Sequence, residues 1–240
     1  MNPTSQGPGA KVATEAAQPY KERLKHLAHA ALEPLTAALA RLGVGPDGVT
    51  IMGLMVSLVA ALAFFEGYFR FGAAMVALSG VCDILDGELA RRSNHRSRFG
   101  AFLDSTLDRL SDGFVLAGIS GFYLVHLTEL ASDPSQTVAE ITRGLEPRTW
   151  AVVSLTAVLA MLGSFMVSYT RARAEGLGLE CRVGWFERPE RMVLLIVAGA
   201  FGVGRVMSAA LILLALLSFA TAIQRVVYIW KNTRGAGRDS

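Results

Sequence analysis

Four aspartates stand at helical spacing within a strongly apolar part of the sequence. Asp83 and Asp86 are three positions apart and Asp104 and Asp108 are four apart, so each pair lies on one face of a helix. Ionised carboxylates in apolar surroundings are costly, and four of them repel one another unless cations neutralise their charge. Ligands that are all oxygen suit Mg²⁺ or Mn²⁺ better than zinc. The spacing predicts a divalent-metal site; separate pairing of each aspartate with a nearby arginine is the structural alternative.

Small residues follow the first aspartate pair. Gly87 and Ala90 lie about one turn apart, which lets another helix or a flat ligand approach the backbone closely. Arg91 comes next, and its guanidinium can bind a phosphate through two parallel hydrogen bonds. Metal ions, an arginine and a patch of small residues together indicate a diphosphate site, because phosphoryl-type transfer depends on charge neutralisation.

The elements that must position these residues are membrane-spanning helices. Hydrophobic residues make up 52% of the 240-residue chain and its mean hydropathy is +0.41, above what a water-soluble surface tolerates. Six apolar segments are predicted to cross a bilayer, although the fifth is short: 49–65, 71–90, 99–127, 150–169, 192–204 and 206–224. The expected fold is an all-α integral membrane protein with six transmembrane helices.

The two aspartate pairs fall at neighbouring ends of these spans. Asp83 and Asp86 lie near the end of the second span, and Asp104 and Asp108 lie near the start of the third. Because the connection between the two spans is short, we expect antiparallel neighbouring helices whose four carboxylates converge at one membrane face.

The rest of the chain divides into three regions. Residues 1–18 are rich in Gly, Pro, Ser and Ala and are predicted to be a disordered tail. Residues 19–45 alternate Lys and Arg with Leu and Ala, which predicts an amphipathic helix in the membrane interface; a cytosolic amphipathic helix is the alternative. The six-helix domain would then occupy residues 46–230, and residues 231–240 would form a basic cytoplasmic tail.

The basic residues set the expected orientation. They gather before the first span, between spans two and three, between spans four and five, and after span six. This pattern places both termini and the four aspartates on the cytoplasmic side of the cell membrane. The net charge of +3 is too small to indicate nucleic acid and fits anionic lipid headgroups. Cys82 and Cys181 fit no ligand spacing, and no disulfide is expected.

Read in order, the chemical residues form a signature. The pattern Asp83-x2-Asp86-Gly87-x2-Ala90-Arg91-x8-Gly100-x3-Asp104-x3-Asp108 resembles that of the CDP-alcohol phosphotransferases at every fixed position. The six spans and the amphipathic N-terminal helix also fit that family, so the resemblance covers about residues 20–230.

The resemblance implies roles for individual residues. Asp83, Asp86, Asp104 and Asp108 would hold two Mg²⁺ or Mn²⁺ ions, and Asp108 would also take the proton of the acceptor hydroxyl. The CDP-lipid would contact the positions of Gly87, Arg91 and Ser97, together with a segment before the first span: Pro46, Asp47, Gly48, Val49 and Thr50. That segment also reads as a turn followed by a helix cap. The family further implies a homodimer.

The acceptor alcohol is suggested by other segments. Residues 103–113, 168–175 and 187–191 resemble the phosphatidylinositol phosphate synthases of actinobacteria. A phosphorylated acceptor needs cations, and we assign Arg109, Arg173 and Arg191 to it. Arg171 and Arg188 are interpreted as membrane-edge anchors or partners of nearby glutamates.

The expected function is metal-dependent transfer of a phosphatidyl group from CDP-diacylglycerol to inositol phosphate, a small phosphorylated polyol, with release of CMP. Free inositol, glycerol 3-phosphate or serine are the alternative acceptors. A divalent-cation transporter or channel would also have six spans and carboxylates, but here the acids lie only at one end of the spans. A non-catalytic lipid-binding scaffold is a third reading.

Overall fold

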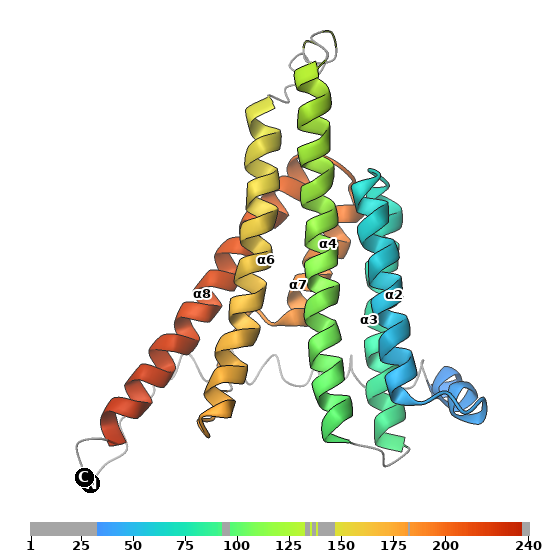
Figure 1. Cartoon of the computed structure of the whole chain (residues 1–240), viewed down its shortest axis with the longest axis vertical. Coiled ribbons are helices and arrows are strands. Elements are labelled where there is room, and N and C mark those ends of the chain that lie inside the picture. The colour runs from blue at the N-terminus through green and yellow to red at the C-terminus, as the bar shows by residue number, and fades with distance from the viewer. Residues whose placement is uncertain are drawn as a thin grey trace, which may run out of the picture.

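The computed structural model describes residues 33–92, 97–132, 135, 138, 147–181 and 183–236. Within these ranges all regular structure is helical (Figure 1), and a helical stretch at residues 33–41 precedes six longer helices. These are α2 (Pro46–Phe65), α3 (Phe69–Arg92), α4 (Arg98–Ser132), α6 (Pro147–Gly176), α7 (Arg188–Ala200) and α8 (Arg205–Ala236). The all-α prediction is confirmed for the residues described.

Helix α2 is the central packing element. It packs against both α3 and α4. Helix α4 also packs against α6, and α6 packs against α8. Helix α7 contacts α3 and α8. Helices α3 and α4 run antiparallel (Figure 1), but they are not among the closely packed pairs. The expectation that they are direct neighbours is therefore wrong, because α2 holds them side by side without bringing their backbones together. Their charged ends still lie at the same end of the bundle.

Four helices are long and apolar enough to cross a membrane: α2, α4, α6 and α8. Helix α3 has 24 residues, a length of about 36 Å, but its second half carries several charges. Helix α7 has only 13 residues; it begins at Arg188, four residues before the predicted span, and ends at Ala200. The chain is thus a multi-pass membrane protein with four clear spans.

Many outward-facing side chains of these helices are apolar, and two pairs of serines between the helices are hydrogen-bonded. Ser57 on α2 and Ser79 on α3 are 2.7 Å apart, and Ser120 on α4 and Ser154 on α6 are 3.0 Å apart. Lipid chains offer no hydrogen-bond partner to a hydroxyl group, so each serine of a pair supplies the partner of the other. The pairs also hold adjacent helices in register. Cys82 and Cys181 are free and buried, as the sequence suggested.

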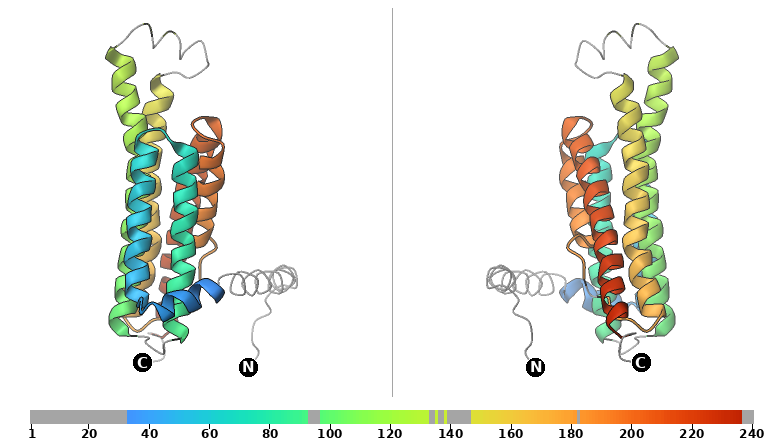
Figure 2. Two further views of the ribbon diagram at one scale, coloured as in Figure 1. Left: turned by 90° about the vertical axis from the view of Figure 1, so that its right-hand side faces the viewer. Right: turned by 90° about the vertical axis from the view of Figure 1, so that its left-hand side faces the viewer.

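The N-terminal helix falls only partly within the described residues. Residues 33–41, blue in Figure 2, lie across the lower end of the bundle at a steep angle to α2 and α3. This placement resembles that of an interfacial helix, while residues 1–32, including the predicted tail, lie outside the described ranges. The C-terminal end of α8 lies at the same end of the bundle as the start of α2 (Figure 1).

The closest approach between α2 and α4 depends on a glycine. A β-carbon at Gly118 would lie 2.2 Å from the carbonyl oxygen of Ala61, so no other residue fits without moving the helix backbones apart. At Gly121, one turn further along, a β-carbon would lie 2.8 Å from the ring of Phe65. Small residues thus set the spacing of the helices that position the aspartates.

Gly118→Ala is expected to destabilise the bundle by about 1–3 kcal/mol or more, because the added methyl group meets backbone rather than a movable side chain. The melting temperature in detergent measures this. Gly176→Ala is the matched control, since a β-carbon there meets nothing within 4 Å and its backbone has no positive φ. Equal melting temperatures for the two variants would contradict the close crossing.

Candidate active site

Two cavities open where α3 ends and α4 begins. The first, called the small cavity, has a volume of about 260 Å³ and is built from α2, α3 and the start of α4. Its lining residues are Pro46, Asp47, Thr50, Asp86, Gly87, Ala90, Ser97, Gly100, Ala101 and Asp104. The small cavity therefore brings together signature residues of α3 and α4 and the first residues of α2.

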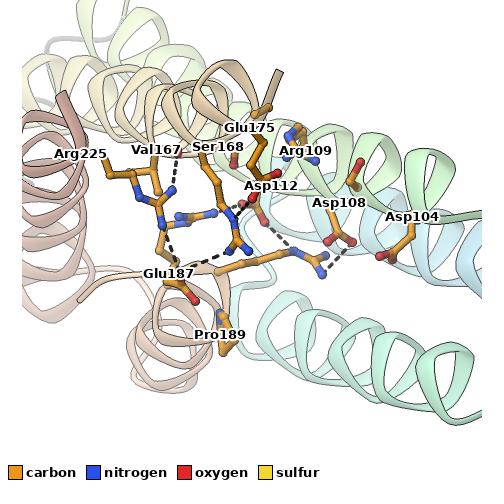
Figure 3. A pocket seen from close by; sticks show the side chains of 16 residues that line it. Asp104, Asp108, Arg109, Asp112, Val167, Ser168, Glu175, Glu187, Pro189 and Arg225 are labelled. Carbon is orange, nitrogen blue, oxygen red and sulfur yellow. Dashed lines mark hydrogen bonds and ion pairs between the residues drawn. The ribbon is translucent and has the colours of Figure 1, made fainter. Parts of the chain in front are cut away.

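The second, called the arginine cavity, has a volume of about 520 Å³ and lies between α4, α6 and the start of α7. It is lined by Ala101, Asp104, Ser105, Asp108, Arg109, Asp112, Val167, Ser168, Arg171, Ala172, Glu175, Glu187, Arg188, Pro189, Arg191 and Arg225. Asp104, Asp108 and Asp112 follow one another along α4 at its edge (Figure 3). Asp104 and Ala101 line both cavities, so the two spaces meet at one carboxylate.

Asp86 is held by the first turn of α2. The Thr50 hydroxyl donates to Asp86 Oδ2 at 2.8 Å, and Asp86 is only 7% exposed. On the same helix, a β-carbon at Gly53 would lie 3.2 Å from Cys82 Cβ and 3.6 Å from Asp83 Oδ1. A threonine and a glycine of α2 therefore fix the orientation of the α3 carboxylates.

The start of α4 is capped inside the small cavity. Ser97 Oγ accepts a hydrogen bond of 2.8 Å from the backbone N–H of Gly100, as expected of a helix N-cap. A β-carbon at Gly100 would lie 3.0 Å from Ser97 Oγ and 3.2 Å from Asp47 Oδ1. The signature glycine thus leaves room for polar groups of two segments to approach each other, and Gly87 faces open space.

A cation already lies among the carboxylates. The Arg188 guanidinium is ion-paired with Asp83 on α3, with Asp108 at 2.8 Å and with Asp112 at 3.5 Å. Arg191, one turn later on α7, is 4% exposed and pairs with Asp112 at 2.9 Å. The short helix α7 therefore brings two arginines to the aspartates of the neighbouring helices.

The donor set fits a hard divalent cation. Asp104 interacts electrostatically with both Asp83 and Asp86, and all candidate ligands are carboxylate oxygens. Across the described ranges no three carboxylate, histidine or cysteine side chains meet as a ready-made metal site. Arg188 is ion-paired with both Asp83 and Asp108, so a positive charge already lies between these two carboxylates. The guanidinium is a stand-in that shows the carboxylates accept positive charge there.

The proposed nucleotide contacts are divided by the structure. Five line the small cavity: Pro46, Asp47, Thr50, Gly87 and Ser97. Three do not: Gly48, Val49 and Arg91. Val49 is completely buried in a cluster with Cys82, Leu85 and Leu89, and the Arg91 guanidinium pairs with Glu88 at 2.8 Å. Ala101, which the sequence did not single out, lines the cavity one position after the signature glycine.

The arginines of the larger cavity differ from those selected by sequence. Arg109 and Arg191 line it, but Arg173 does not. Successive helix residues point about 100° apart, so Ser168, Arg171 and Glu175 share a face of α6 that excludes Arg173. Arg171 pairs with Glu175 at 2.9 Å, as its alternative interpretation required, yet it also faces the cavity.

Arg188 and Arg225 are the residues that sequence reasoning missed. Arg188 pairs with aspartates rather than with the glutamates expected of it. Arg225 follows directly on the last apolar segment and was read only as a basic residue after it. An arginine directly after such a long apolar segment is the signal that could have identified Arg225 as a residue with a specific partner.

Comparison with known proteins places these features in a wider group. Residues 44–230 match the family model of the CDP-alcohol phosphatidyltransferases. The chain is 38% identical to the archaetidylinositol phosphate synthase of Methanothermobacter thermautotrophicus over 197 residues, which cover 81% of this chain and 87% of that protein.

Solved structures of a phosphatidylinositol phosphate synthase from Mycobacterium tuberculosis are also similar. The form with bound CDP-DAG has a TM-score of 0.68 and 31% identity, covering 82% of this chain and 92% of that one. The form in complex with manganese and citrate has a TM-score of 0.67 and 32% identity, covering 82% and 88%.

Asp104→Asn is expected to weaken Mn²⁺ binding by about tenfold or more, because a neutral amide removes both a ligand and negative charge. Titration of the purified protein followed by electron paramagnetic resonance of free Mn²⁺ measures this. Glu129→Gln is the control, since Glu129 is an exposed carboxylate near the opposite end of α4. Unchanged Mn²⁺ affinity in Asp104→Asn would rule this aspartate out as a ligand.

Proposed function

Because the chain belongs to the CDP-alcohol phosphatidyltransferase family, we propose that it transfers a phosphatidyl group from CDP-diacylglycerol to inositol phosphate. The products are phosphatidylinositol phosphate and CMP. One observation carries the proposal: Asp104 lines both a cavity built from signature residues and a cavity rich in arginine. Two substrates bound in these spaces would meet at the carboxylates.

The small cavity is the proposed site of the cytidine diphosphate group. Gly87 offers open space to a flat ligand, and the Thr50 and Ser97 hydroxyls and the Asp47 carboxylate border it. The similar mycobacterial structure with bound CDP-DAG supports a CDP-lipid as donor. Gly48, Val49 and Arg91 are not among the contacts we propose, because none of them lines this space.

The arginine cavity is the proposed acceptor site. Arg109, Arg171, Arg188 and Arg191 supply positive charge for a phosphate, and Asp112, Ser168 and Glu175 supply acceptors or donors for hydroxyl groups. An acceptor with both a phosphate and several hydroxyls matches this mixture. Free inositol lacks the phosphate, and serine and glycerol 3-phosphate offer fewer hydroxyl groups. The similar archaeal protein is an archaetidylinositol phosphate synthase and the similar mycobacterial protein is a phosphatidylinositol phosphate synthase, so both are named for lipids that carry inositol phosphate.

The chemistry is an in-line displacement. An acceptor hydroxyl oxygen attacks the phosphorus that bears the diacylglycerol, its proton passes to Asp108, and the bond to the CMP phosphate breaks. Divalent metal ions held by Asp83, Asp86, Asp104 and Asp108 supply charge neutralisation for the diphosphate and the leaving phosphate. Arg188 pairs with Asp108 at 2.8 Å and borders the acceptor space, so an incoming phosphate would compete for its guanidinium.

Membrane placement follows from the same features. We propose that α3 and α7 complete six crossings, that residues 46–230 form the catalytic domain, and that residues 19–45 lie in the interface. The cavities and both chain ends would face the cytoplasm of the cell, where CDP-lipid in the membrane and a water-soluble acceptor meet. Family resemblance also favours a homodimer, which native mass spectrometry would test. A transporter is disfavoured, since the cluster of aspartates lies at one end of the helices and no matching cluster lies further along them within the described residues.

The direct test measures CMP release from CDP-diacylglycerol with Mg²⁺ or Mn²⁺ across a panel of acceptors. Inositol phosphate is expected to be used best, ahead of free inositol, glycerol 3-phosphate and serine. CDP-archaeol belongs in the panel as a second donor, because one similar protein is an archaetidylinositol phosphate synthase. No CMP release with any acceptor would exclude the transferase function, whereas preference for another acceptor would overturn only that assignment.

Asp108→Asn is expected to lower kcat by about 100-fold or more, because the variant cannot accept the hydroxyl proton. The KM for CDP-diacylglycerol should change by no more than about twofold, since Asp108 lines the arginine cavity and not the small one. Initial rates at varied donor concentration provide both constants. Normal kcat with weakened donor binding would reduce Asp108 to a metal ligand.

Arg171 and Arg173 form a matched pair on one helix. Arg171→Gln is expected to raise the KM for inositol phosphate by about tenfold, because hydrogen bonds to charged groups are worth roughly 1.5–3 kcal/mol. Arg173→Gln should change this KM by less than about threefold, since its side chain lies outside the cavity. The reverse ranking would restore the assignment made from sequence alone.

Cysteine labelling tests the orientation. Thr233→Cys, near the end of α8, should react with a membrane-impermeant maleimide only from the cytoplasmic side, and Ser132→Cys, at the end of α4, only from outside. The native thiols of Cys82 and Cys181 are buried and give little background. The opposite pattern in sealed cells and inverted vesicles would reverse the proposed topology.

A further inference from the structure

Arg225 on α8 is a buried arginine with every nitrogen engaged. Its side chain is 2% exposed, and it donates three hydrogen bonds: Nη1 to the Val167 carbonyl at 2.6 Å, Nε to the Val183 carbonyl at 2.8 Å, and Nη2 to Glu187 Oε1 at 3.0 Å. Burying a charged guanidinium costs free energy, and hydrogen bonds offset that cost only when the acceptors are held in matching positions.

The three partners lie on three different segments. Val167 is on α6, one turn before Arg171; Val183 is in the segment between α6 and α7; and Glu187 is the N-cap residue of α7. The Glu187 backbone N–H in turn donates to Glu190 Oε2 at 3.1 Å, which closes the first turn of α7. One side chain of α8 therefore fixes the entry of α7 relative to α6.

A glycine is required for this arrangement. Gly184 has φ of +138°, a conformation that side chains other than glycine rarely adopt. A β-carbon there would lie 3.0 Å from Arg225 Nη2 and 3.0 Å from Thr221 Cγ2. The connecting segment is therefore shaped to lie directly on the Arg225 guanidinium.

Glu187 joins this contact to the arginine cavity. Its Oε1 atom accepts from Arg225 and lies 3.7 Å from Arg171 Nη1. The next residue is Arg188, whose guanidinium reaches Asp83 and Asp108. Displacement of Glu187 would thus move a cavity arginine on α6 and the arginine that bridges the aspartates.

We propose that Arg225 is a positioning residue: by holding Val183 and Glu187 against α6, it places Arg171 and Arg188 for acceptor binding. The catalytic part of this inference rests on the proposed function. Arg225 does not itself bind the acceptor, because all three nitrogens are committed to protein partners and the side chain is almost fully buried.

The first test needs no substrate. Cys181 is 1% exposed in the segment that Arg225 holds, and Cys82, 4% exposed on α3, is an internal reference. Arg225→Gln is expected to raise the alkylation rate of Cys181 by about tenfold or more, measured by peptide mass spectrometry, with Cys82 unchanged. Arg205→Gln, exposed at the other end of α8, is the matched control and should change neither rate.

The second test uses kinetics. Arg225→Gln should raise the KM for inositol phosphate by about tenfold and leave the KM for CDP-diacylglycerol within about twofold, because the small cavity contains no residue of α6, α7 or α8. Arg225→Lys should recover part of the loss. The effects of Arg225→Gln and Glu187→Gln should be less than additive in the double variant, since both act through one contact.

The outcomes separate the two proposals. Unchanged Cys181 alkylation in a folded Arg225→Gln protein would overturn the positioning role, and so would raised alkylation with an unchanged acceptor KM. A wild-type protein that uses no acceptor would defeat the proposed function while the alkylation result still decides whether Arg225 holds the segment. If Arg225→Gln does not fold, Glu187→Ala replaces it, because Glu187 is 46% exposed and alanine cannot accept from Arg225 Nη2; unchanged Cys181 alkylation together with an unchanged acceptor KM there would overturn the role of the Arg225–Glu187 contact.

Discussion

The structure depends on balancing negative charge inside a membrane protein. Asp83, Asp86, Asp104, Asp108 and Asp112 gather near one end of two helices, where repulsion among carboxylates would otherwise separate them. Arg188 and Arg191 on α7 provide opposing charge from a third helix. Helix α7 has only 13 residues, and its first turn places these two arginines beside the aspartates.

The same constraint explains the role of α2. Because the two aspartate-bearing helices do not pack closely, their spacing is set by an intervening helix that contacts both. Gly118 lets α4 approach Ala61 of α2, and Gly53 lets α3 approach the other side. Thr50 then binds Asp86 directly. The small cavity lies between the charged ends of α3 and α4 and the start of α2, the arginine cavity lies between α4, α6 and the start of α7, and Asp104 lines both.

The two cavities differ in how they are supported. The small cavity is framed by helix backbones and small residues, so its shape follows from close helix packing. The arginine cavity is framed by long charged side chains, and their positions depend on ion pairs with Glu175, Glu187 and Asp112. Arg225 extends this network to α8. The shape of the arginine cavity is therefore more sensitive than that of the small cavity to contacts outside the cavity itself.

The sequence by itself determined the helical fold, the helical spacing of the signature aspartates and most residues of the small cavity. These features depend on local patterns: apolar length, helical spacing and a signature whose members lie within 26 consecutive positions, 83 to 108. The tertiary structure decided which arginines face the arginine cavity. The sequence favoured Arg173 over Arg171, but only Arg171 lies on the face of α6 that lines this cavity. The partners of Arg188 lie 76 to 105 positions away and those of Arg225 lie 38 to 58 positions away, and no local spacing encodes such contacts.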